Sequence, residues 1–133
     1  MTKPSLVGTW ALLRGTCTAA DGTPRPEPYG PKGMGRVSFS PDGYMVAVVC
    51  DCRADLPDDV EREYNSYCGT YTFDGKRLVT KVFANSDPRR LSVDQIRDIH
   101  FEGELLVMRP PPSADRGHIG DQRVVWWEKI AEV

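Results

Sequence analysis

The stretch LVGTW, residues 6–10, opens the first apolar segment of the 133-residue chain. Gly8 lets the backbone turn tightly into this segment, and Trp10 supplies a large apolar ring with one polar edge. From Leu6 to Cys17 the side chains alternate between two faces, which predicts a β-strand. Glycine and tryptophan meet by chance in many proteins, so the segments that follow residues 6–10 decide the fold.

Strand-like segments make up most of the chain. The clearest hairpin is centred on Ser40-Pro41-Asp42-Gly43, in which proline presets the first corner of a turn and glycine accepts a positive φ. Eight segments are predicted as strands: 6–17, 35–39, 44–52, 69–74, 77–85, 92–101, 104–109 and 122–130.

A single helix is expected over residues 56–66, LPDDVEREYNS, because a proline and two aspartates suit a first helical turn. The strands do not alternate with helices, so a parallel sheet is excluded. We predict an all-β, eight-stranded antiparallel up-and-down barrel, because this closure leaves no sheet edge exposed. Eight strands enclose room for side chains or for one small ligand.

Size and charge narrow the class of protein. The whole chain, residues 1–133, is expected to form one domain. The net charge is -2, the isoelectric point is near 5.7, and no basic stripe is present, which argues against nucleic acid or an anionic membrane as the main partner. No signal peptide is recognised, and the apolar run 45–50 is far short of a membrane span. We expect a cytoplasmic monomer or homodimer.

Four cysteines, Cys17, Cys50, Cys52 and Cys68, allow a disulfide set, a zinc site or free thiols. Without a secretion signal, reduced thiols are favoured. Cys50 and Cys52 lie on alternate strand positions, which suits a four-ligand metal shell poorly, and no second CxxC pair accompanies them. We therefore expect neither a metal nor a cofactor.

Taken in order, several blocks of the chain resemble the lipocalin-like domain family, small bacterial and fungal relatives of the lipocalins. Barrels of this type begin with Gly-x-Trp, whose indole plugs the closed end. The chain departs from the pattern at Thr80-Lys81, where a histidine is expected, and at Lys129, where arginine is common. The matching blocks are residues 6–10, 28–31, 35–45 and 67–71, the Arg97 strand with its Gly103 turn, and residues 127–129.

Strand alternation predicts which side chains point into the barrel. The expected ligand-binding residues are Trp10, Arg14, Tyr29, Phe39, Tyr67, Phe73, Ile99, Phe101 and Trp127. Arg97 is the first candidate for catalysis, because a guanidinium among apolar neighbours either anchors an anionic group on the ligand or pairs with a carboxylate of the barrel. Arg14 has the same two interpretations, with a solvated position at the rim favoured.

Tyr71 is the second catalytic candidate, as a phenolic donor to a carbonyl oxygen, against ordinary packing of its ring. His100 falls on the outward face with Asp98 and Glu102, and Lys129 is expected to lie over the Trp10 ring at the base. The 21–33 loop and the predicted helix are possible lids. Glu61, Glu63 or Tyr64 could act as a base there, although a solvated acidic face is the plainer interpretation.

Three functions fit these residues. The leading one is a cofactor-independent isomerase, cyclase or dehydratase acting on a small, largely apolar metabolite, with Arg97 and a tyrosine stabilising an enolate-like charge. The second is a non-catalytic binding or carrier protein. The third is a structural barrel filled with side chains, which would have no cavity. Fold alone does not choose among them.

Overall fold

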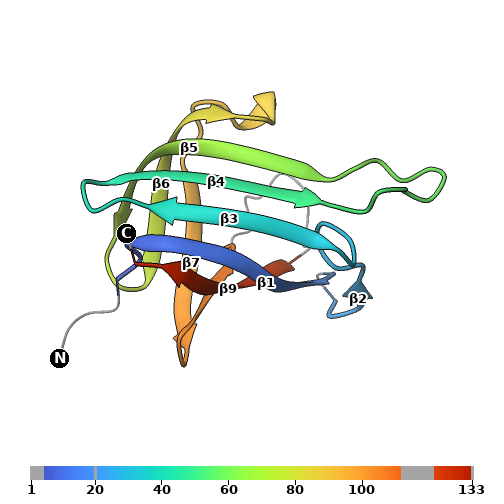
Figure 1. Cartoon of the computed structure of the whole chain (residues 1–133), viewed down its shortest axis with the longest axis horizontal. Helices are drawn as coiled ribbons and strands as arrows, with labels where there is room; N and C mark the ends of the chain where they lie inside the picture. Colours follow the sequence, from blue (N-terminus) through green and yellow to red (C-terminus); the bar gives the residue numbers. More distant parts are fainter. Residues whose placement is uncertain (1–4, 20, 112–121, 133) are drawn as a thin grey trace.

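The structure, a computed structural model, describes residues 5–19, 21–111 and 122–132. Nearly all of this part of the chain is β-structure (Figure 1). The strands are β1 (Gly8–Thr18), β2 (Pro24–Arg25), β3 (Gly33–Phe39), β4 (Tyr44–Asp51), β5 (Tyr64–Phe73), β6 (Arg77–Asn85), β7 (Gln95–Glu102), β8 (Leu105–Arg109) and β9 (Gln122–Ala131).

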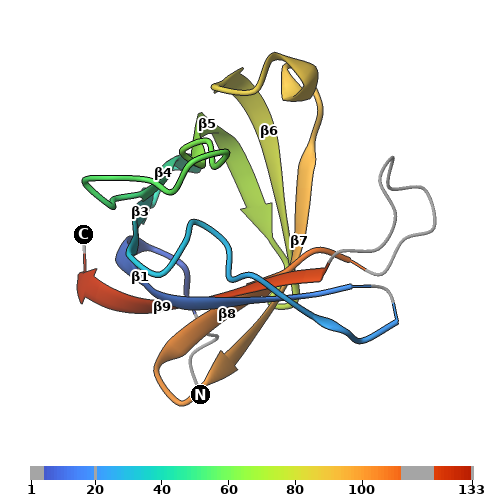
Figure 2. The ribbon, with the colours of Figure 1, turned by 90° about the vertical axis from the view of Figure 1, so that its right-hand side faces the viewer.

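Each long strand pairs antiparallel with the next along the chain, and β1 also pairs with β9. This last pairing closes eight strands into a barrel and confirms the predicted up-and-down topology, with the two-residue β2 added to the end of β1. The hairpin between β3 and β4 turns where expected, with Gly43 at a φ of 94°. Figure 2 views the barrel from the end at which the 52–63 loop and β2 lie.

The predicted helix over residues 56–66 is wrong. Residues 57–60 form a turn in which the Val60 N–H donates to the Pro57 carbonyl, and Asp59 has a φ of 68°, which a helix does not allow. The following residues are captured by strand pairing, since β5 begins at Tyr64 opposite Cys50. The helical segment of the described chain is the single 3-10 turn η1 (Pro88–Arg90). No helix in the described ranges has the length and apolarity to cross a membrane.

A bulge in β1 reverses the expected direction of Arg14. Leu12 pairs with Trp127 and Arg14 with Trp126, so Leu13 is an extra residue on the β1 side. Beyond such a bulge, residues that would have faced inward face outward. The Arg14 guanidinium lies outside the barrel, 3.9 Å from the centre of the Trp126 ring.

The closed end of the barrel is filled by side chains from the start of β1 and β4 and the end of β3, β7 and β9. Trp10 is buried there, and its Nε1 donates to the Leu6 carbonyl at 2.9 Å. The predicted contact with Lys129 is confirmed, because its Nζ lies 5.0 Å from the Trp10 ring centre. Trp10 also packs against Phe101, and Phe39 packs edge-on against Tyr71. One end of the barrel is therefore solid.

Candidate functional site

A cavity of about 510 Å³ occupies the opposite, open half of the barrel. It lies where β4, β6 and β8 end and where β5, β7 and β9 begin. A volume of this size suits one small molecule of drug-like dimensions. The filled-barrel interpretation, which requires a packed interior, does not fit this structure.

The floor and walls of the cavity are apolar. Val37, Ala47, Val49, Met108 and Trp127 are buried core residues that also line it. They come from β3, β4, β8 and β9, and their inward direction follows from strand alternation. This lining is apolar apart from the indole N–H of Trp127, which is buried and has no hydrogen-bond partner among the described residues, so it favours shape over specific polar contacts.

The mouth of the cavity is cationic. Among the described residues, four arginines line it, Arg89, Arg90, Arg97 and Arg123, against two carboxylates, Glu63 and Asp87. Asp87 bonds Arg89 at 3.0 Å and lies 3.7 Å from Arg90, and Glu63 bonds Arg123 at 2.6 Å. Arg97 alone among the four is not exposed. The described part of the cavity lining therefore has an excess of positive charge, and Arg97 is the least exposed of its four arginines.

Arg97 lies beside a half-buried tyrosine, Tyr67. Burial raises the pKa of Tyr67, an effect that the neighbouring Arg97 charge opposes, and the Tyr67 hydroxyl interacts with Gln95. The phenol is therefore protonated at neutral pH and can donate a hydrogen bond. Arg97 Nη1 donates to the Ile96 carbonyl at 2.7 Å, which fixes one side of the guanidinium. A guanidinium and a phenol at one place in the wall make a donor pair suited to an oxyanion.

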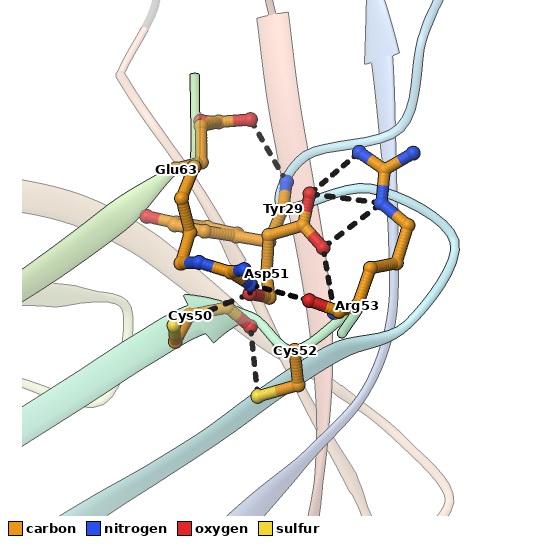
Figure 3. A network of polar contacts seen from close by, with 7 residues as sticks. Tyr29, Cys50, Asp51, Cys52, Arg53 and Glu63 are labelled. Atoms are coloured by element: carbon orange, nitrogen blue, oxygen red, sulfur yellow. Dashed lines mark hydrogen bonds and ion pairs between the residues drawn. The ribbon is translucent and has the colours of Figure 1, made fainter. Parts of the chain in front are cut away.

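Asp51 anchors the loops at the mouth. It is the last residue of β4 and 1% exposed, and its carboxylate receives three hydrogen bonds from the Arg53 side chain, the shortest at 2.6 Å (Figure 3). These bonds hold the pKa of Asp51 below its ordinary range, with burial opposing them. Gly30, at a φ of 70°, passes so close that a Cβ there would lie 2.5 Å from the carboxylate. Asp51 thus fixes the 52–63 loop and the 28–33 segment.

Glu63 forms the second anchor. Its Oε1 accepts from the Tyr29 backbone N–H at 3.0 Å, and its Oε2 accepts from Arg123. The Arg123 guanidinium lies 5.9 Å from the Tyr29 ring centre. Burial raises the pKa of Tyr29, which lines the cavity. We call the contacts of Asp51 and Glu63 with these loops the mouth clasp.

The structure divides the sequence-predicted site residues between the two ends of the barrel. Tyr29, Tyr67, Arg97 and Trp127 line the cavity. The others do not: Arg14 lies outside, and the closed-end packing contains Trp10, Phe39, Tyr71, Phe73, Ile99 and Phe101. Alternation predicts the face of a strand but not the height along the barrel, which depends on where the interior is filled.

Tyr71 is held by packing instead of by the cavity. Its hydroxyl donates to the Ser40 carbonyl at 2.8 Å, and its ring meets Phe39 with 5.0 Å between centres. We expect Tyr71→Phe to lower stability by about 1 kcal/mol, the usual contribution of one such hydrogen bond. The affinity of the Tyr71→Phe variant for a cavity ligand should equal that of the wild type. Chemical denaturation and ligand titration check the two expectations, and a loss of affinity would contradict the placement of Tyr71.

Other polar groups lie away from the cavity. His100 faces outward as predicted, with Nε2 3.0 Å from Glu102. The thiol of Cys17 is buried, those of Cys50 and Cys68 are half-buried, and that of Cys52 is exposed; all four are free. Within the described ranges, no three His, Cys, Asp or Glu side chains gather as a metal site would require. His118, which the sequence places in a glycine-containing loop and predicts to be exposed, lies outside the described residues.

At the described mouth, sequence reasoning missed Asp51, Asp87, Arg89, Arg90 and Arg123. Asp51 stands between Cys50 and Cys52, and in this segment the sequence suggested only a role for the two thiols. A signal was nevertheless present, because an aspartate ending an apolar strand, with arginines at positions 53 and 62, predicts a buried ion pair. Arg123 gave no such signal, since its partner Glu63 is distant in the sequence and was expected on a helix.

Comparison with known proteins agrees with the barrel and its cavity. The family model described as a lipocalin-like domain matches residues 7–130. No curated protein matches the chain. The match runs from the first strand to the end of the last, so it covers every element that forms the cavity. The chain belongs to the lipocalin-like domain family, whose barrel suits the binding of a small molecule.

Proposed function

We propose that the protein binds a small molecule with an apolar body and an anionic head group. The observation that carries this proposal is the polarity of the cavity, whose described residues form an apolar floor and place four arginines against two carboxylates at the mouth. The apolar body would lie against Val37, Met108 and Trp127. The head group would lie at Arg97, where a carboxylate or phenolate gains charge-assisted hydrogen bonds.

A matched panel of ligands tests this function. Aromatic and medium-chain carboxylic acids are compared with their primary amides, which keep the body and remove the charge. We expect the acids to raise the melting temperature and the amides to raise it far less, because only the acids use the excess positive charge. Equal shifts would contradict the anionic head group, and no shift from any member would contradict small-molecule binding in the cavity.

A second function, cofactor-independent isomerisation, cyclisation or dehydration, is favoured by one observation. The Tyr67 phenol, a protonated donor at neutral pH, lies near the Arg97 charge, so the two could stabilise an enolate-like oxygen in a transition state. In this version Tyr67 takes the role that the sequence suggested for Tyr71. Tyr67→Phe would then abolish turnover of a bound ligand and largely retain its binding. A ligand recovered unchanged from wild-type protein after prolonged incubation would contradict the enzymatic version.

A further inference from the structure

Two thiols flank Asp51 at the end of β4. Cys52 is exposed, and its Sγ donates to the Cys50 carbonyl at 3.6 Å. Cys50 is half-buried, and its Sγ donates to the Asp51 carbonyl at 3.4 Å (Figure 3). The two sulfurs thus lie against the same short piece of backbone, and burial, followed by the neighbouring Cys52 thiol, raises the pKa of Cys50. Neither cysteine is among the residues that line the cavity.

We propose that Cys50 and Cys52 are a redox-active dithiol that closes to a disulfide and, in closing, loosens the mouth clasp. Alternate residues of an extended strand have Cα atoms about 6.6 Å apart. A disulfide accepts Cα separations up to about 6.8 Å but prefers about 5.5–6 Å. Side chains that project in parallel from one face of a strand also have Cβ atoms about 6.6 Å apart, whereas a disulfide needs Cβ atoms about 3.5–4.5 Å apart. The pair can therefore close only if the backbone at Asp51 contracts, which links the thiol chemistry to the anchor between the two cysteines.

A small disulfide such as oxidised glutathione supplies the oxidant. The Cys52 thiolate attacks one glutathione sulfur, forming a mixed disulfide and releasing one glutathione thiolate. The Cys50 thiolate then attacks the Cys52 sulfur and releases the second. Two electrons pass from the cysteines to glutathione, and the two protons that the cysteines lose balance the two that glutathione gains. Exposure makes Cys52 the first nucleophile, whereas burial raises the pKa of Cys50 and suits it to the second step.

The backbone between the two thiols carries the bonds that a contraction would disturb. The Asp51 N–H donates to the Glu63 carbonyl at 2.9 Å, and the Cys52 N–H donates to the Lys32 carbonyl at 3.1 Å. Arg62 Nη1 donates to the Asp51 carbonyl at 2.5 Å and to the Arg53 carbonyl at 2.7 Å. These bonds hold the 52–63 loop, so oxidation should loosen the backbone around Arg62, whose side chain is already exposed.

Peptide mass measurement tests disulfide formation without any cavity ligand. The protein is incubated with oxidised glutathione, free thiols are alkylated, and the unfolded chain is digested with trypsin. Residues 37–53 form one tryptic peptide that contains Cys50 and Cys52 but neither Cys17 nor Cys68. We expect this peptide to lose two hydrogen atoms and to escape alkylation, and dithiothreitol should reverse both changes. Two alkylated cysteines, or two stable glutathione adducts, would overturn the proposal.

Native trypsin digestion tests the coupling to the clasp. Cleavage after Arg62 in the folded, oxidised protein is expected to be several-fold faster than in the reduced protein. Cys50→Ser should retain the glutathione adduct at Cys52 and should not show this acceleration. Cys68→Ser, a half-buried thiol on the neighbouring strand, is the matched control and should behave as the wild type. A disulfide that leaves the Arg62 cleavage rate unchanged would contradict the link to the clasp.

Discussion

Replacing Arg97 by alanine is expected to weaken binding of an anionic cavity ligand by about 10- to 100-fold, because a charge-assisted hydrogen bond contributes about 1.5–3 kcal/mol. The same substitution should leave affinity for the uncharged amide nearly unchanged. Arg97→Lys keeps the charge but loses the planar fork, so its affinity for the acid should lie between those of the wild type and Arg97→Ala. Isothermal titration calorimetry with the acid and its amide measures these affinities for the wild type and both variants.

Arg14→Ala is the matched control for Arg97. Both residues are arginines on strands, and both were expected at the ligand, but Arg14 stacks on Trp126 outside the barrel. Its replacement should leave affinity for the acid unchanged. If Arg14→Ala weakens binding as much as Arg97→Ala, the effect is one of overall charge, and the assignment of the head group to Arg97 is wrong.

Replacing Asp51 by alanine is expected to lower the melting temperature by roughly 5–10 °C. The substitution leaves the Arg53 guanidinium without the carboxylate that accepts its hydrogen bonds, and it releases both loops of the mouth. Thermal unfolding followed by circular dichroism measures the change. Asp98→Ala removes a more exposed ion pair with Arg77 and should lower the melting temperature by at most roughly 3 °C.

The effect of Asp51 should depend on pH with a definite sign. Because Arg53 lowers the pKa of Asp51 in the folded protein, the carboxylate contributes stability that is fully present above its unfolded pKa, about 3.9. That contribution is lost as the pH falls through the lower, folded value. The gap in melting temperature between wild type and Asp51→Ala should therefore be constant near neutral pH and shrink below about pH 3.9. A gap that widens in acid would show that Asp51 is not a stabilising carboxylate.

The closed barrel was predictable because its evidence is local. The alternation of each strand and the Ser40–Gly43 turn can be recognised within a few residues, and the strands follow one another directly along the chain. Closure was expected because a closed barrel leaves no unpaired sheet edge. The helix predicted over residues 56–66 was wrong because the local preference of this segment opposes its tertiary environment. Its charges suit a helix, but pairing of β5 with β4 extends the residues from Tyr64 onward.

The candidate site was predictable only in part. Arg97 and Tyr67 reach the cavity because nothing interrupts the alternation of their strands, whereas one bulged residue in β1 turns Arg14 outward. Tyr71 faces inward too, but it lies at the end where Trp10 and Phe39 fill the barrel. The mouth clasp joins residues far apart in the chain, such as Glu63 and Arg123, and single-strand patterns do not encode such pairs.

Native mass spectrometry of gently purified protein, with identification of any released molecule, tests the central claim most directly. The account predicts a retained small molecule with an apolar body and an ionised acidic group, and loss of that molecule from Arg97→Ala but not from Arg14→Ala. A retained neutral or cationic molecule would contradict the role given to the arginines of the mouth. Protein that is empty, and that no acid or amide of the panel stabilises, would contradict the assignment of the cavity as a binding site.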